Sequence, residues 1–229
     1  MHRHGVLDFA KARRNMVEGQ LRPNGVTDNR LLDAMGSIPR ELFVPPTHVG
    51  IAYSDAAIPL MPDRWMMPPL PLARLLEAAS IGPKDRVLEL AAGTGYATLV
   101  LAMLTSSVAS VEPNALLHKE AAKNVETYAP GRTQMLAGAP VEGCIAHAPF
   151  DVIFINGSVD FLPDYLFSQL EEGGRLVAIV REHDRAHIVH MGHARVYRKI
   201  KGEISSRDVF DANVPPAPGF VAEESFSFC

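Results

Sequence analysis

Short apolar segments alternate with longer segments of helical periodicity between Arg86 and Val180, and this alternation constrains the fold more than any other feature of the chain. The expected strands are residues 86–90, 108–111, 133–136, 152–155 and 176–180, and the expected helices are residues 96–104, 114–128 and 161–170. Apolar strands joined by crossover helices form a parallel sheet that is buried on both faces. The sequence therefore predicts an α/β fold with a Rossmann-like, mostly parallel sheet.

The chain changes character after Val180. Strand-like stretches at residues 194–200, 207–214 and 221–228 follow one another without helical segments between them. Strands that lack crossover helices pair with antiparallel neighbours. We therefore expect an antiparallel edge at the C-terminal side of the sheet.

The first 80 residues differ from the rest of the chain. Two short helices are expected, at residues 9–21 behind the N-cap Asp8 and from Thr27 to about Met35. Residues 38–71 carry eight prolines together with large apolar side chains, which indicates an ordered loop rather than a linker. A helix is expected to follow, ending near Gly82. We expect residues 1–80 to pack on the sheet domain, residues 81–229, rather than to fold independently.

Composition argues against several classes of function. The chain has 22 basic and 26 acidic residues and no long run of either sign, which argues against a nucleic-acid-binding surface. Its two cysteines form no disulfide framework, its first ten residues lack the apolar core of a signal peptide, and no apolar stretch approaches about twenty residues. We expect a cytoplasmic protein without a membrane span. The sequence does not specify an oligomeric state.

The segment that carries the chemistry runs from Val87 to Tyr96, where a strand passes through a glycine turn into a helix. Gly93 and Gly95 let a ligand approach the backbone, and the helix N-terminus offers free amides and a partial positive charge. Thr98 stands where a dinucleotide site has a third glycine, and no Gly-Lys-Ser/Thr supports a P-loop. A pyrophosphate is therefore not the expected ligand.

Two glutamates suggest which ligand the turn takes. Glu89 precedes the glycines and suits a ligand with an ammonium and a sulfonium, which is S-adenosylmethionine. Glu112 ends the next strand, where an acidic residue accepts hydrogen bonds from ribose hydroxyls. Asn156, at the end of the 152–155 strand, is also placed to line the cleft. In the alternative interpretation, the glycines only shape a tight turn and both glutamates are solvated strand ends.

The order of six sequence motifs resembles the protein-L-isoaspartate O-methyltransferase family from about residue 8 to residue 215. The motifs are Arg40-Glu41-Leu42-Phe43-Val44-Pro45, Ala52-Tyr53-Ser54-Asp55, Asp85 to Glu89 with Gly93-Thr94-Gly95-Tyr96, Ser110-Val111-Glu112, Pro149-Phe150-Asp151 and Gly173 to Val177. The resemblance implies a class I S-adenosylmethionine-dependent methyltransferase fold. It also implies a carboxyl O-methyltransferase that acts on protein or peptide substrates in protein repair. In that family reading, Gly93 and Gly95 lie under the methionyl group, Glu112 holds the ribose, and residues 40–71 cover the acceptor.

The chain departs from the family pattern at three places. Ala91 replaces a third glycine of the turn. Gly138-Ala139 stands where the family has Gly-Asp, whose carboxylate accepts from the adenine amino group. Residues 62–68, Pro-Asp-Arg-Trp-Met-Met-Pro, replace an acceptor loop similar to Gly-Gln-Thr-Ile-Ser. We keep Glu89, Ala91, Gly93, Gly95, Glu112, Gly138, Ala139 and Asn156 as the predicted cofactor site.

The divergent loop gives the candidates for acceptor binding. It has no hydroxyl to offer a substrate, but Arg64 supplies a cation for a bidentate pair with a carboxylate, and Trp65 supplies an apolar wall. We therefore expect slow or absent turnover of simple isoaspartyl peptides. Three alternatives remain: a methyltransferase with another acceptor, a cofactor-binding protein without turnover, and a nicotinamide oxidoreductase, which only the glycine turn would support.

Two other features of the sequence, a histidine cluster and the lack of a serine-hydrolase motif, say less about function. His183, His187, His190 and His193 include a pair at helical spacing, but no Glu or Cys completes a familiar ligand set, so we expect exposed histidines and no metal. No Gly-x-Ser-x-Gly elbow supports a serine hydrolase.

Overall fold

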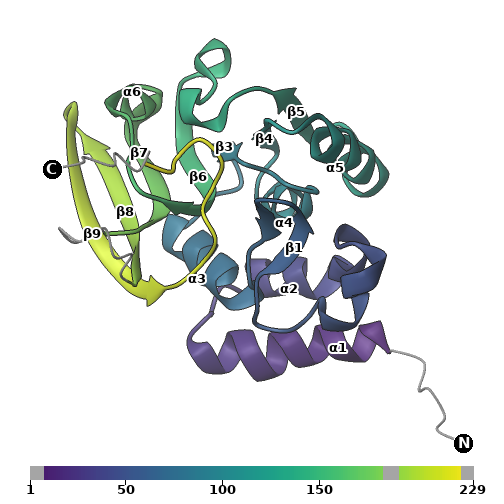
Figure 1. The fold of residues 1–229 in the computed structure, drawn as a ribbon. Coiled ribbons are helices and arrows are strands. Elements are labelled where there is room, and N and C mark those ends of the chain that lie inside the picture. Colours follow the sequence, from purple (N-terminus) through teal and green to yellow (C-terminus); the bar gives the residue numbers. More distant parts are fainter. Residues whose placement is uncertain (1–7, 183–190, 223–229) are drawn as a thin grey trace, which may run out of the picture.

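The computed structural model describes residues 8–182 and 191–222, and the fold is built on a seven-stranded sheet (Figure 1). The strand order is β5-β4-β3-β6-β7-β8-β9. Strands β3 to β7 run parallel to one another, and β8 pairs antiparallel with both β7 and β9. The expected fold class is confirmed. The strands are β3 (Arg86–Leu90), β4 (Ser107–Glu112), β5 (Thr133–Ala137), β6 (Phe150–Val159), β7 (Leu170–Val180), β8 (Gly192–Ile200) and β9 (Glu203–Ala212).

Both faces of the central strands β3, β4 and β6 are buried, which explains their continuous apolar sequence. Val87 of β3 and Phe154 of β6 belong to one hydrophobic cluster, whereas Leu88 and Ile155 of the same strands belong to a second. Side chains that alternate between two cores leave no polar face on the central strands. The helices around the sheet are α3 (Pro69–Ala79), α4 (Tyr96–Leu104), α5 (Ala115–Tyr128) and α6 (Asp164–Ser168).

The strand order reverses at β3, and this reversal places the site. The strand β4 pairs with one side of β3, and β6 pairs with the other, with Leu90 opposite both Val111 and Ile155. In open α/β sheets a crevice forms at such a switch point, outside the carboxyl ends of the strands. Glu112, Asn156 and the turn after Leu90 all lie at these ends.

The N-terminal part consists of short elements that share a core with the sheet. They are α1 (Phe9–Met16), a π-helical turn (Val17–Leu21), a 3₁₀ turn (Arg22–Asn24), α2 (Asn29–Ser37), two further 3₁₀ helices (Arg40–Phe43 and Pro46–Ile51), β1 (Ile58–Met61) and β2 (Arg64–Met66). Asp8 caps α1 as expected, accepting from the Lys11 amide at 2.9 Å. Buried Leu32 and Met35 of α2 belong to the same cluster as Leu99 of α4. That residues 1–80 do not fold independently stays a prediction.

Two expected elements differ in the structure, and a third lies mostly outside the described residues. The expected loop at residues 38–71 contains the antiparallel β1–β2 hairpin, whose alternation is hidden by prolines and methionines. The expected helix at 161–170 is only α6, because Pro163 precedes it and β7 already begins at Leu170. Most of the expected strand at 221–228 lies outside the described residues. In the parts that the structure describes, no helix is long and apolar enough to span a membrane.

Gly95 fixes how closely helix α5 approaches the glycine turn. Its φ is +88°, and a Cβ there would lie 3.2 Å from the Cα of Ala121 in α5. We expect Gly95→Ala to lower the free energy of unfolding by about 2 kcal/mol or more, since left-handed alanine costs roughly 1–2 kcal/mol and overpacking adds about 1–3 kcal/mol.

Urea denaturation checks this value, and Gly25→Ala is the matched control. Gly25 has φ +85°, but a Cβ at this position would have no neighbour within 4 Å, so the variant reports the backbone cost alone. Equal losses in the two variants would contradict the proposed packing of α5 against the turn.

Candidate functional site

The turn between β3 and α4 wraps around the end of β4. The amides of Ala91 and Ala92 both donate to the carbonyl of Val111, at 2.9 and 3.1 Å. Ala91, Gly93 and Gly95 have positive φ values of 69°, 63° and 88°. This backbone conformation explains why glycine is favoured here, and it puts Ala91 in a region that an alanine adopts only at a cost.

Glu112 holds the turn and the start of α5 together. It is the last residue of β4, and its side chain is fully buried. Oε2 accepts the Gly93 amide at 2.7 Å, and Oε1 accepts the Asn114 amide at 2.9 Å. Backbone amides from two loops therefore fix the carboxylate at the carboxyl ends of the strands.

Arg64 completes the coordination of Glu112. Both terminal nitrogens of its guanidinium donate to the two carboxylate oxygens, and Nη2 lies 2.7 Å from Oε2. Arg64 is itself only 8% exposed. Sequence reasoning assigned Glu112 to the cofactor and Arg64 to the acceptor, at separate sites, whereas the structure brings the two side chains into one buried ion pair. The role of Arg64 as an acceptor clamp stays a prediction and requires the guanidinium to leave Glu112.

Glu89 is part of the framework behind the turn. Its carboxylate is fully buried and accepts from Thr98 Oγ1 at 2.5 Å, Ser110 Oγ at 2.7 Å and Asn156 Nδ2 at 3.1 Å. Burial raises the pKa of Glu89, and the hydrogen bonds from these three side chains oppose that rise. This arrangement favours a positioning role, in which Glu89 orients Asn156, over direct contact with a ligand.

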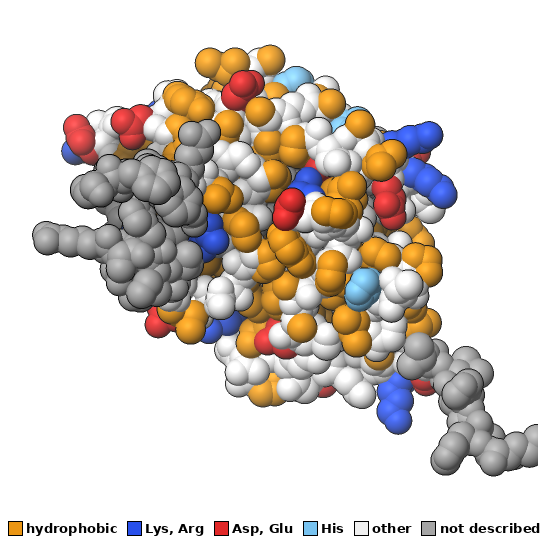
Figure 2. Space-filling view, viewed as in Figure 1, with side chains coloured by type: hydrophobic (Ala, Val, Ile, Leu, Met, Phe, Trp, Pro, Cys, Tyr) orange, Lys and Arg blue, Asp and Glu red, His pale blue; other side chains and the backbone are white. Residues whose placement is uncertain are grey.

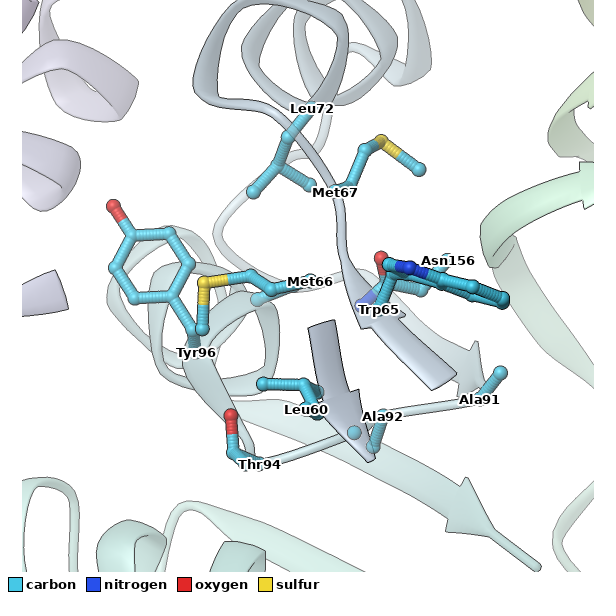
Figure 3. A pocket seen from close by; sticks show the side chains of 12 residues that line it. Leu60, Trp65, Met66, Met67, Leu72, Ala91, Ala92, Thr94, Tyr96 and Asn156 are labelled. Atoms are coloured by element: carbon cyan, nitrogen blue, oxygen red, sulfur yellow. The ribbon is translucent and has the colours of Figure 1, made fainter. Parts of the chain in front are cut away.

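The β1–β2 hairpin lies over the turn. Leu60, Trp65, Met66 and Met67 face residues 91–94 and Asn156 across a cavity of about 10 Å³, roughly the space of one water molecule (Figure 3). A Cβ on Gly93 would meet Leu60 Cδ1 at 3.3 Å. The space above the glycine turn is therefore filled by the hairpin in this conformation.

Buried Arg40 anchors the segment that carries the hairpin, a role that sequence reasoning did not assign. Its Nε donates to the Ala52 carbonyl at 2.8 Å and its Nη2 to the Met67 carbonyl at 2.5 Å, while the guanidinium lies 4.7 Å from the centre of the Tyr96 ring. Burial lowers its pKa, although guanidinium groups stay protonated in proteins. The signal for this role was present, since Arg40 opens one of the sequence motifs, but its partners are backbone carbonyls that no pattern reveals.

Of the remaining predicted positions, Asn156 lines this cavity, whereas Gly138 and Ala139 lie outside its lining. Gly138 and Ala139 are exposed at the carboxyl end of β5, next to the end of β4. The methyl side chain of Ala139 cannot accept a hydrogen bond. Asn156 lies in a β-bulge of β6, between Phe154 and Ser158. His193 lies on β8 with Nδ1 2.8 Å from an Asp211 oxygen, and the other three histidines of the cluster lie outside the described residues. No group of metal-binding side chains occurs in the described ranges 8–182 and 191–222.

Charged side chains form no single patch on the face shown in Figure 2. Lys and Arg side chains are scattered over that face, and apolar side chains lie across its centre. The predicted absence of a nucleic-acid partner stays a prediction.

The comparisons with known proteins agree on one family. The family model for protein-L-isoaspartate(D-aspartate) O-methyltransferase matches residues 11–210. A protein-L-isoaspartate O-methyltransferase of Koribacter versatilis is 40% identical over 172 residues, which are 75% of this chain and 78% of the relative. One from Methylorubrum extorquens is 40% identical over 173 residues, 75% of each chain. The resemblance predicted from the sequence is confirmed.

Solved structures agree with these matches. A protein-L-isoaspartate O-methyltransferase structure has a TM-score of 0.75 and 26% identity, covering 90% of this chain and 66% of that chain. The chain thus spans slightly less than two thirds of that protein. A Plasmodium falciparum structure has a TM-score of 0.74 and 18% identity, covering 90% of this chain and 97% of that one. It is described as a candidate enzyme of this kind in complex with S-adenosyl-L-homocysteine.

Ala91 offers a test of strain in the turn. We expect Ala91→Gly to be more stable to unfolding than Ala92→Gly by about 1–2 kcal/mol, because only the first change relieves a left-handed alanine. Ala92 is a matched control, since it adjoins Ala91 and both are 3% exposed. Thermal and urea denaturation measure the difference. If the two glycine variants were equally stable, Ala91 would not be strained.

Proposed function

Since the chain belongs to the protein-L-isoaspartate(D-aspartate) O-methyltransferase family, we propose that it is an S-adenosylmethionine-dependent carboxyl O-methyltransferase that acts on isoaspartyl residues of proteins or peptides. The observation that carries this proposal is the placement of Glu112. Its carboxylate is held by the amides of Gly93 and Asn114 where the ends of β3 and β4 meet the glycine turn. A buried carboxylate that accepts hydrogen bonds, beside a glycine turn that a ligand can approach closely, suits a nucleoside.

The residues present fit this cofactor in chemistry. The Glu112 carboxylate would accept from the ribose hydroxyls, and Gly93 and Gly95 would let the methionyl part approach the backbone. Ala91 and Asn156 would line the cleft, and Glu89 would orient Asn156. Gly138 and Ala139 would lie near the adenine, without a side-chain contact to its amino group. When bound, S-adenosylmethionine supplies a methyl group on a positively charged sulfur.

The chain's own residues need to do little chemistry in this reaction. A substrate carboxylate has an ordinary pKa near 4, so it is ionised at neutral pH and needs no general base. The bound cofactor would supply the methyl group to one carboxylate oxygen, and the electrons of its carbon–sulfur bond would stay on sulfur. The apolar side chains of Trp65, Met66 and Met67 would exclude water and hold the acceptor in line. The product, an isoaspartyl methyl ester, collapses towards a succinimide, which is the repair step.

The acceptor is where the chain diverges from its family. The loop at residues 62–68 offers no hydroxyl, and Arg64 and Trp65 are the side chains proposed to contact the acceptor. A methyltransferase with another anionic acceptor is the second candidate, favoured by this loop alone. A cytoplasmic location is part of the proposal, and the two widely spaced cysteines fit a reducing compartment.

Cofactor binding separates the main proposal from other uses of the fold. We expect titration calorimetry to show binding of S-adenosylmethionine and S-adenosylhomocysteine and no binding of NADH, because the turn lacks the glycine pattern of a dinucleotide site. Binding of NADH in preference to both sulfur ligands would overturn the proposal in favour of an oxidoreductase.

Methyl transfer tests the acceptor. We expect labelled methyl to reach an isoaspartyl peptide but not its aspartyl counterpart, at least tenfold more slowly than with a family member that has the hydroxyl-bearing loop. Sites that lose hydrogen-bond partners for a polar substrate lose much of their rate and discrimination. A rate equal to that of the family member would show that the divergent loop does not affect the acceptor. Transfer to neither peptide would leave the second candidate.

A further inference from the structure

We infer that this chain closes its own cofactor site, with Arg64 of the β1–β2 hairpin occupying the carboxylate of Glu112 until the cofactor displaces it. This inference rests on the proposed function, because it is that function which gives Glu112 to the ribose. Three features of the structure support it: the coordination of Glu112, the filling of the space above the turn, and the separation of the hairpin from the seven-stranded sheet.

The coordination of Glu112 is complete. Each carboxylate oxygen accepts one backbone amide and one terminal nitrogen of Arg64. A carboxylate has about four lone-pair sites, so ribose hydroxyls cannot be added without removing a donor. The Gly93 amide belongs to the βα turn and the Asn114 amide to the N-cap of α5, so both are fixed by the fold. Arg64 is therefore the donor that has to leave.

The hairpin also fills the space that a ligand needs. Leu60 lies against Gly93, and Trp65, Met66 and Met67 close the remainder, which leaves a cavity of about 10 Å³ (Figure 3). Pockets for small molecules have volumes of roughly 300–1,000 Å³. Because β2 carries Arg64 together with Trp65 and Met66, a displacement of this strand would release the guanidinium and open the space together.

No strand of the seven-stranded sheet pairs with the hairpin, although Ile58 and Met66 pack in the main hydrophobic cluster. Its strands β1 and β2 have four and three residues and form a sheet of their own, separate from the seven-stranded sheet. Asp63 in its turn is left-handed, with φ +58°. A two-stranded hairpin is marginally stable without other contacts. The Arg64–Glu112 pair, with side-chain exposures of 9% and 0%, is the most buried of the ion pairs described in the structure, and it acts as the latch.

A latch of this kind sets the affinity for the cofactor. When only a fraction of the molecules is open, the apparent dissociation constant is the intrinsic one divided by that fraction. Weakening the latch therefore tightens binding without adding any contact to the ligand. A residue that instead contacted the cofactor or merely supported the site would have the opposite effect when replaced.

The test compares Arg64→Gln with the intact chain by calorimetric titration with S-adenosylhomocysteine. We expect the dissociation constant to fall at least tenfold. Arg175→Gln is the matched control, because Arg175 also forms a partly buried ion pair, with Asp85 at 2.6 Å. Arg175 pairs in the sheet with Val152, near the amino end of β6, whereas the glycine turn lies at the carboxyl ends of the strands. The affinity of Arg175→Gln for S-adenosylhomocysteine should stay unchanged. An affinity for Arg64→Gln that is unchanged or weaker than that of the intact chain would overturn the latch.

Trp65 gives a readout that does not depend on the ligand. It is the only tryptophan of the chain and lies on β2, next to Arg64. We expect quenching of its fluorescence by acrylamide, a neutral quencher, to rise in Arg64→Gln and to stay unchanged in Arg175→Gln. If neither the intact chain nor either variant binds S-adenosylhomocysteine, the proposed function fails. The quenching then decides the latch alone: a rise supports it, and no change overturns it.

A second pair of variants guards against misfolding and separates the two roles of Glu112. Should Arg64→Gln not fold, Arg64→Lys, which keeps the charge but loses the bidentate geometry, is judged by the same criteria. Adding Glu112→Gln to Arg64→Gln isolates the ribose contact from the latch. We expect that double variant to bind at least tenfold more weakly than Arg64→Gln, and equal binding would overturn the competition for Glu112.

Discussion

The coordination of one buried carboxylate organises this molecule. Glu112 ends β4 and accepts from the turn after β3, from the start of α5 and from the β1–β2 hairpin. A buried charge is tolerated only when it is paired and fully hydrogen-bonded, so each of these segments depends on the others. The N-terminal segment is thereby tied to the sheet at the point where a ligand of this fold would bind. In our proposal, the two hydrogen bonds from Arg64 both stabilise the closed state and control access to the site.

The fold was predictable because its signals are local. Apolar strands of the right length alternate with helices, and this pattern identifies a parallel sheet before any contact is known. The same logic located Glu112 and Asn156, since the carboxyl ends of adjacent parallel strands meet at one edge. Local patterns also explain the errors. Pro163 delays the start of α6, so the helix is shorter than expected. The prolines of residues 38–71 mask the strand pattern of the β1–β2 hairpin, which becomes visible only from the pairing of its two strands.

The candidate site was predictable only as two separate halves. Sequence reasoning found an acidic group and a cation, but not that Arg64 and Glu112, 48 residues apart, form one pair. Such a contact depends on how the hairpin folds back over the turn, which no period or spacing encodes. The anchoring of that segment by Arg40 is hidden for a similar reason, since backbone carbonyls leave no trace in the sequence. The left-handed conformation of Ala91 likewise becomes visible only in the backbone.

A structure of the protein crystallised with S-adenosylhomocysteine would test the central claim most directly. The account predicts that the ribose hydroxyls lie on the Glu112 carboxylate, that the Gly93 and Asn114 amides keep their hydrogen bonds, and that the Arg64 guanidinium has left Glu112 together with the hairpin. A complex in which the ligand is bound at the turn while the Arg64–Glu112 pair remains intact would contradict it.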